Sequence, residues 1–268
     1  MKKVLTIAGS DTCGGAGIQA DLKTFAAHGV YGMSVVTAVT AQNTQRVYDV
    51  QDIMPEMIAK QIDAIFEDIE VAALKIGMVS VSGTIQTIAE KLIKYQAENI
   101  VLDPVMISKS GFPLLQVEAR ETLIAKLLPL ATITTPNIPE AETITGKKIL
   151  SLEDMKEAAK MISSLGPAYV LVKGGHRAEE ATDILFDGEI FYEMKAPRVN
   201  TKNTHGTGCT LSASITSNLA NGMAVVEAVE ASKKYITMAI EHSLAIGKGV
   251  GPTNHFYELY KKAGLSYE

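Results

Sequence analysis

Short apolar runs alternate with longer amphipathic stretches along most of the chain. The runs are rich in Val, Ile and Leu, and the stretches between them carry apolar residues at helical spacing. Apolar strands separated by helices are typical of a parallel sheet covered on both faces. The pattern predicts strands at 4–8, 34–40, 72–76, 100–102, 132–134 and 169–173. It predicts helices at 17–27, 55–66, 84–95, 117–128, 208–220 and 225–244, and one that follows an N-cap at Ser151 and ends near 165.

The alternation of strands and helices is interrupted at 181–194, where Asp187-Gly188 separates two strand-like runs. Such a dipeptide between apolar runs indicates a β-hairpin. The sequence shows no internal repeat or linker. We therefore expect one α/β domain spanning residues 1–268, with an antiparallel addition late in the sheet.

Composition narrows the possible partners. The 268 residues are 47% hydrophobic and carry a formal net charge of −5 without a basic run, so we expect no nucleic acid partner. The apolar stretches are too short for a membrane span. The two cysteines, Cys13 and Cys209, lie too far apart in sequence to suggest a disulfide framework, which favours a reduced, cytoplasmic setting.

Polar residues gather where the predicted strands end. In parallel α/β folds, ligands bind beyond the carboxyl ends of the strands. Asp11, Gln42, Asp103, Asn137 and Lys173 all occupy such positions. The sequence therefore predicts a ligand site along this edge.

The segment 9–21 (GSDTCGGAGIQAD) joins a strand to a helix and contains the dinucleotide fingerprint G-x-G-x-x-A. A nicotinamide oxidoreductase would also need a carboxylate at the end of the second strand, where this chain has Gln42 and no acid. Two other interpretations are a tight turn with positive φ and a small-molecule site floored by backbone. In the second, the buried carboxylate of Asp21 would accept hydrogen bonds from a ligand's amino group.

The segment 204–210 (THGTGCT) opens an apolar helix, and the sequence has no P-loop. Glycines expose backbone N–H groups, and a helix N-terminus favours anions, so the segment is a candidate phosphate site. Cys209 lies in the first turn, where thiol pKa values tend to fall. The structural alternative is a glycine-rich N-cap with a small buried Cys.

Carboxylates and a lysine complete the candidate chemistry. Asp103 and Glu140 are candidate Mg²⁺ ligands, with a helix cap and a solvated first-turn residue as their structural alternatives. Lys173 ends an apolar strand, from which it could reach nucleotide phosphates. His205 and His255 are expected to be ordinary surface histidines, with general-base roles as the alternative.

Taken in order, these motifs resemble a known family. Residues 8–11 (AGSD), 14–23 (GGAGIQADLK), 103–106 (DPVM), 135–137 (TPN), 173–175 (KGG) and 204–210 follow one another as in the hydroxymethylpyrimidine/phosphomethylpyrimidine kinases of thiamine biosynthesis, a branch of the ribokinase-like superfamily. The resemblance runs nearly end to end. It implies a three-layer α/β/α ribokinase-like sandwich with a mostly parallel sheet, commonly dimeric, and ATP- and Mg²⁺-dependent phosphorylation of the pyrimidine and then of its monophosphate.

The resemblance also implies site roles. Gln42 would bind the pyrimidine, and Asp103 and Lys173 would serve the nucleotide phosphates. The remaining substrate-binding residues would be Gly9, Asp21, Met78, Val105 and Lys109. Phosphoryl transfer would involve Gly206, Thr207, Gly208, Cys209 and Lys173, and the nucleotide would contact Asp103, Asn137, Lys173 and Thr207. The metal ligands would be Asp103 and Glu140.

Two positions bear on how far the resemblance extends. Most ribokinase-like enzymes have an Asp base where this chain has Cys209, although the pyrimidine-kinase branch has Cys there. At Thr12 and Cys13, residues such as Ser, Pro or Gly are common, so this chain places a second thiol near the site.

The strongest alternative is a pyridoxal kinase of the same fold. The Gln42 amide can both donate and accept, which matches an aminopyrimidine edge. Lys109, in a segment that looks like the family's flap, is a candidate ligand of the monophosphate substrate, with an exposed loop lysine as the alternative. A non-catalytic binding module would not need Asp103, Glu140, Lys173 and the glycine segment together.

Overall fold

The computed structural model describes residues 1–107, 111–175 and 181–265. Within these ranges, the strands form one nine-stranded sheet in the order β3-β2-β1-β4-β5-β6-β7-β8-β9. The strands are β1 (Lys3–Ser10), β2 (Tyr31–Gln42), β3 (Val47–Asp52), β4 (Ala73–Ile76), β5 (Ile100–Leu102), β6 (Ile133–Thr134), β7 (Tyr169–Val172), β8 (Asp183–Phe186) and β9 (Phe191–Met194). The helices are α1 (Gly17–Ala27), α2 (Pro55–Phe66), α3 (Ser82–Lys94), α4 (Val117–Lys126), α5 (Ile138–Thr145), α6 (Leu152–Ser163), α7 (Thr207–Ala220), α8 (Val225–Glu241) and α9 (Tyr257–Lys262), with a short 3₁₀ turn, η1 (Leu128–Leu130).

The central strands are parallel, as the apolar pattern predicts. β2, β1, β4, β5, β6 and β7 pair in parallel, whereas β3 pairs antiparallel to β2 and the hairpin β8–β9 continues antiparallel from β7. The carboxyl ends of six neighbouring strands therefore meet along one edge. The predicted hairpin around Asp187-Gly188 is confirmed, and so is Ser151 as the N-cap of α6.

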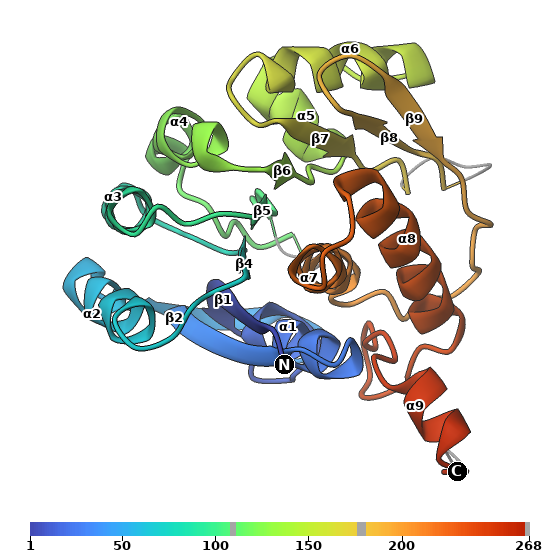
Figure 1. The fold of residues 1–268 in the computed structure, drawn as a ribbon. Coiled ribbons are helices and arrows are strands. Elements are labelled where there is room, and N and C mark those ends of the chain that lie inside the picture. The colour runs from blue at the N-terminus through green and yellow to red at the C-terminus, as the bar shows by residue number, and fades with distance from the viewer. Residues whose placement is uncertain (108–110, 176–180, 266–268) are drawn as a thin grey trace.

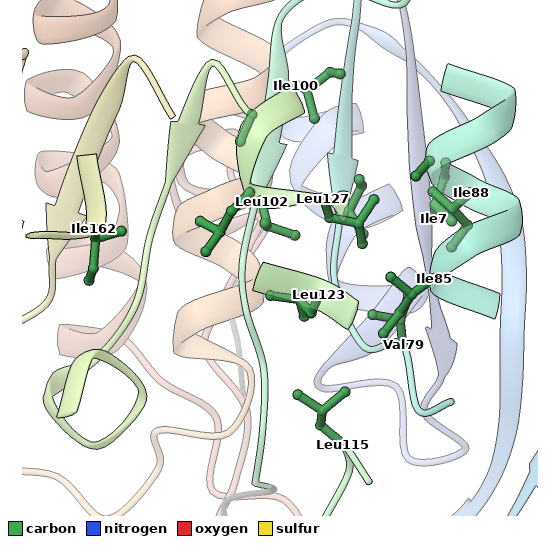
Figure 2. Close-up of a cluster of buried hydrophobic side chains, with 14 of the residues drawn as sticks. Ile7, Val79, Ile85, Ile88, Ile100, Leu102, Leu115, Leu123, Leu127 and Ile162 are labelled. Carbon is green, nitrogen blue, oxygen red and sulfur yellow. The ribbon is translucent and has the colours of Figure 1, made fainter. Parts of the chain in front are cut away.

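Helices cover both faces of the sheet (Figure 1). α2, α3 and α4 lie on one side, and α7 and α8 lie on the other. The larger core cluster packs α3 and α4 against the strands, and Figure 2 shows Leu123 of α4 and Leu102 of β5 among its side chains. A second cluster packs Leu211 and Ile215 of α7 against Val101. This three-layer arrangement confirms the expected fold class.

Four elements were not expected from the pattern: β3, α5, α9 and the 3₁₀ turn η1. β3 has mostly exposed residues, so it lacks the apolar run of a buried strand. α5 is only eight residues long and follows a proline-containing segment, but Asn137 and Glu140 form a capping box at its start. Among the described residues, no helix is long and apolar enough to cross a membrane.

Candidate active site

The β1–α1 loop is organised by the carboxylate of Asp11. Oδ1 accepts a hydrogen bond from the Cys13 N–H at 3.0 Å, and Oδ2 accepts from Gly15 N–H at 3.0 Å and Ala16 N–H at 2.8 Å. His205 Nε2 lies 2.8 Å from the same Oδ2 atom. Burial alone would raise the pKa of Asp11, but His205, the Ala16 N–H and the Cys13 side chain lower it to about 2. The loop therefore surrounds a carboxylate that is ionised at neutral pH.

The two glycine segments, almost two hundred residues apart in sequence, lie against each other. Gly206 has φ of +77° and passes so close to Gly15 that a Cβ atom would overlap the Gly15 carbonyl oxygen. The positive φ and the close approach to Gly15 both require that residue 206 has no side chain.

The N-terminus of α7 faces a partly buried ion pair. A Cβ on Gly208 would lie 3.4 Å from Asp103 Oδ2 and 3.5 Å from Lys173 Nζ. The N–H groups of Gly208 and Cys209 are among the first donors of the helix, which have no acceptor inside it. The predicted anion-favouring turn and the predicted phosphate residues are thus neighbours.

Lys173 and Asp103 form the centre of this group. Their Nζ and Oδ1 atoms are 2.9 Å apart, and Thr135 donates to the same Oδ1 at 3.1 Å. Burial opposes ionisation of Asp103, but Lys173 and Lys75 hold its pKa below the usual value. The charge of Asp103 raises the pKa of Lys173 in spite of burial. Both groups are therefore charged at neutral pH.

Glu140 lies next to this pair and is buried, not solvated. Its Oε2 accepts from the Asn137 N–H at 2.8 Å, while Asn137 Oδ1 accepts from the Glu140 N–H at 2.9 Å. Burial and the charge of Asp103 raise the pKa of Glu140 to about 7, although Lys173 opposes the shift. The capping contacts fix Asn137 and Glu140 on α5, and the sequence alternative of a solvated first-turn Glu140 is wrong.

Asp103, Asn137 and Glu140 offer oxygen atoms of the type that Mg²⁺ prefers, and Lys173 supplies a cation beside them. Asp103 Oδ2 points toward Gly208, whereas its Oδ1 atom is taken by Lys173 and Thr135. An ion held through water between Asp103 and the helix start fits this donor set. The residues present are therefore compatible with Mg²⁺.

The Cys209 thiol differs from its sequence expectation. It is partly accessible at the start of α7. Its crowded surroundings raise the pKa to about 11, although Lys75 and the Gly17 N–H oppose this shift. The helix terminus was expected to lower the thiol pKa, and burial overrides that effect here. At neutral pH the resting group is a thiol.

Asp21 and Met78 were both predicted to line the pyrimidine pocket, and the structure gives them different surroundings. The Asp21 carboxylate is fully buried, with Oδ1 2.6 Å from Lys75 Nζ and Oδ2 accepting from Thr6 at 2.6 Å. It therefore has no accessible surface for a ligand's amino group. A Cβ on Gly9 would lie 3.0 Å from the Met78 sulfur, so Gly9 and Met78 are neighbours.

Gln42 ends β2 beside the Asp11 loop. Its Nε2 atom lies 3.4 Å from His205 Nε2, and the two residues line a cavity of about 50 Å³. Val105, partly accessible, follows Asp103 at the end of β5. Thr207 donates its hydroxyl to the Thr204 carbonyl at 2.8 Å. Lys109 lies outside the described residues.

Both candidate histidines are buried, so the expectation of surface histidines is wrong. His205 is 6% exposed and contacts Asp11, whereas His255 is 6% exposed and lies 3.1 Å from Thr210 Oγ1. Lys75 was missed entirely, because a single Lys inside an apolar strand gives no indication of its partner. The position of His205 directly before Gly206 was the one sequence signal that it would lie at the site, in contact with Asp11.

Comparison with known proteins gives this geometry a context. The profile of the family described as phosphomethylpyrimidine kinase matches residues 11–254. A hydroxymethylpyrimidine/phosphomethylpyrimidine kinase from Rhizobium meliloti is 51% identical over 96% of this chain and 98% of its own length.

Solved structures show the same likeness. A phosphomethylpyrimidine kinase from Clostridium difficile is 56% identical with a TM-score of 0.81, covering 90% of this chain and 100% of that one. A Bacillus subtilis pyridoxal kinase in complex with ADP is 42% identical with a TM-score of 0.90, covering 96% of this chain and 98% of that one. The fold is therefore ribokinase-like, and the chain belongs to the phosphomethylpyrimidine kinase family.

Proposed function

We propose that this enzyme transfers the γ-phosphoryl group of ATP to the hydroxymethyl group of 4-amino-5-hydroxymethyl-2-methylpyrimidine, and then phosphorylates the monophosphate to the diphosphate, in thiamine biosynthesis. The names of its full-length relatives support this assignment. The structural observation that carries it is the contact of the α7 N-terminus with Lys173 and Asp103, on the strand edge where Gln42 also ends β2.

The proposed division of labour follows from the chemistry of each group. The N–H groups of Gly208 and Cys209 stabilise charge on the transferring phosphoryl group, and Lys173 binds phosphate oxygens. Gln42 pairs with the aminopyrimidine edge, beside Gly9 and Met78. Thr207 and Asn137 contribute further polar contacts to the nucleotide, and Val105 lines the substrate side. Lys109 is proposed as a ligand of the monophosphate.

A bound Mg²⁺ would supply positive charge that offsets the negative charge of the phosphate oxygens. Asp103 and Glu140 are proposed to hold it, largely through water. The Lys173 contact keeps Asp103 ionised and therefore ready to face a cation. Asp21 is proposed to act indirectly, by holding Lys75 beneath the site, since both of its oxygens are occupied.

Pyridoxal kinase activity is the second candidate, because the backbone matches a Bacillus subtilis pyridoxal kinase with a TM-score of 0.90. Purified enzyme should be assayed with ATP, Mg²⁺ and, separately, hydroxymethylpyrimidine, its monophosphate and pyridoxal. We expect both pyrimidines to be phosphorylated efficiently. Efficient turnover of pyridoxal alone would overturn the assignment.

We also propose that the enzyme is a cytoplasmic homodimer. Exposed Val39 and Tyr48 lie on the β2–β3 edge and would suit a second copy of the chain. Light scattering coupled to size-exclusion chromatography tests this. A mass near that of one chain across a range of concentrations would refute the dimer.

A further inference from the structure

Three side chains with different metal-binding atoms meet at the β1–α1 loop, beside the proposed pyrimidine site. Asp11 Oδ2, Cys13 Sγ and His205 Nε2 all lie within 4.8 Å of one another. The separations are 2.8 Å between Asp11 and His205, 3.5 Å between Asp11 and Cys13, and 3.6 Å between Cys13 and His205. The proposed phosphoryl transfer needs no thiol at position 13.

These separations can be compared with those around a tetrahedral zinc ion. Zinc bonds of about 2.0 Å to oxygen, about 2.05 Å to nitrogen and about 2.3 Å to sulfur place O and S about 3.5 Å apart, N and S about 3.6 Å apart, and O and N about 3.3 Å apart. Both sulfur separations already have these values. The 2.8 Å separation of Asp11 and His205 would have to widen by about 0.5 Å, as the metal replaces their hydrogen bond.

The surroundings hold the ligands in place. The N–H groups of Cys13, Gly15 and Ala16 fix the Asp11 carboxylate. Hydrogen bonds of this kind orient the ligands of metal sites. Asp11 and His205 are buried, while Cys13 is partly accessible, so an ion can enter from the Cys13 side.

The set of ligand atoms selects the kind of metal. A thiolate, an imidazole and a carboxylate suit Zn²⁺, whereas Mg²⁺ prefers oxygen ligands and retains its waters. Three protein ligands leave a fourth tetrahedral position open. Gln42 Nε2 lies 3.4 Å from His205 Nε2, so an ion bound to His205 would lie close to the residue proposed to recognise the pyrimidine.

We propose that Asp11, Cys13 and His205 form a binding site for Zn²⁺ or a similarly thiophilic divalent cation, and that the bound ion competes with the pyrimidine substrate. The competition rests on the proposed function of Gln42; the metal site does not. On binding, a metal–sulfur bond forms, the S–H bond of Cys13 breaks, and its proton goes to the buffer. The enzyme would thus be inhibited by free zinc independently of its Mg²⁺ requirement.

Cobalt tests the site without any activity measurement. Co²⁺ takes zinc sites and gives a thiolate-to-metal absorption band when sulfur is a ligand. We expect the full-length enzyme to bind one Co²⁺ per chain with this band, and Zn²⁺ to displace it. Cys13→Ser should lose the band, whereas Cys209→Ser should keep it. Absence of the band in the wild type at a large excess of Co²⁺, or its persistence in Cys13→Ser, would overturn the proposal.

A second measurement needs no variant that might unfold. Zn²⁺ should protect Cys13 of the wild type from alkylation, as read by peptide mass mapping, and Mg²⁺ should not. Equal labelling of Cys13 with and without Zn²⁺ would count against the site.

Enzyme kinetics then distinguishes zinc binding from the proposed competition between zinc and the pyrimidine. With free Zn²⁺ set by a metal buffer, since ATP also binds Zn²⁺, inhibition should raise the KM for the pyrimidine with little change in kcat. Cys13→Ser should retain activity in the absence of zinc and weaken the inhibition by about 10-fold or more. If the cobalt band depends on Cys13 but zinc inhibition is not competitive, the metal site stands and the competition is refuted.

Discussion

Lys75 Nζ lies 2.6 Å from Asp21 Oδ1 in the middle of the protein, where neither side chain has any accessible surface. The charges of Asp21 and Asp103 raise the pKa of Lys75 in spite of burial, so the ammonium is charged at neutral pH. The charge of Lys75, on the central strand β4, therefore acts on the ionisable groups of the site.

We predict that Lys75→Met lowers the free energy of unfolding by about 3–5 kcal/mol, because the buried Asp21 carboxylate loses its partner. The double variant Lys75→Met with Asp21→Leu should recover much of this loss, since no unpaired charge remains. Urea unfolding of both variants measures the difference. Additive losses in the double variant would mean that the pair is not coupled.

Lys173 should matter for catalysis more than for stability. Its ammonium group lies 2.9 Å from Asp103 Oδ1 and borders Gly208 at the start of α7. Lys173→Met should lower kcat/KM for ATP by about 10²–10³-fold, the size expected for loss of one charged phosphate contact. The matched control is Lys195→Met, because Lys195 is exposed and lies beside Glu193. This variant should leave kcat/KM unchanged. Similar kinetics of the two variants would remove Lys173 from the proposed site.

Gly206→Ala tests the close approach of the two glycine segments. Gly206 and Gly222 both have positive φ, but only at Gly206 would a Cβ meet neighbouring backbone. Gly222→Ala should therefore lower the free energy of unfolding by only about 1–2 kcal/mol, the cost of a left-handed backbone at a residue with a side chain, and should keep full activity. Gly206→Ala should cost more and abolish turnover. Equal melting temperatures for the two variants would contradict the structural account of Gly206.

Cys209→Ala should slow turnover far more than it weakens ATP binding, because the backbone N–H groups proposed to bind the phosphates remain. We expect kcat to fall by about 10²-fold, with the Kd of ATP almost unchanged. Single-turnover kinetics and calorimetry give the two values. Near-normal turnover would exclude the thiol as an essential base, and recovery of activity in Cys209→Ser would assign it a hydrogen-bonding role.

We predict that the buried His255 makes the free energy of unfolding fall as the solution becomes acidic. Burial lowers its pKa from 6.5 to about 4, so the unfolded chain binds a proton more readily than the folded one. The stability contributed by neutral His255 is complete above the unfolded pKa and is lost as pH falls from 6.5 toward 4.

Between pH 7.5 and pH 5 this single group should reduce the free energy of unfolding by about 2 kcal/mol. In His255→Gln, the change between these two pH values should be smaller by about that amount. Chemical unfolding at both pH values checks this. An identical pH dependence in the two proteins would rule out His255 as a source of the acid sensitivity.

The sequence predicted the layers of the fold because burial leaves a direct trace in the apolar pattern. α1 and α2 have the predicted bounds, and β5 does too. The exposed strand β3 and the short helix α5 were missed because neither is defined by buried apolar spacing: β3 is paired along one edge, and α5 is fixed by its capping box.

The candidate site was only partly predictable for a different reason. Strand ends indicated Gln42, Asp103 and Lys173, because chain topology alone brings such positions to one edge. The partners of Asp21 and His205 depend on contacts 54 and 194 residues away in sequence. The raised pKa of Cys209 likewise depends on burial by distant segments, which a first-turn position does not reveal.

The contact between the segments around Gly15 and Gly206 also bears on how the enzyme is made. A nascent chain has all of its parallel strands before residue 204 is synthesised, yet the β1–α1 loop still lacks the groups that meet Gly15 and Asp11. Contacts this distant in sequence form late, since they must first overcome the entropy of closing a long loop. Partly synthesised chains should therefore bind no phosphate at this centre, and catalytic competence should appear only after the last third of the protein has left the ribosome.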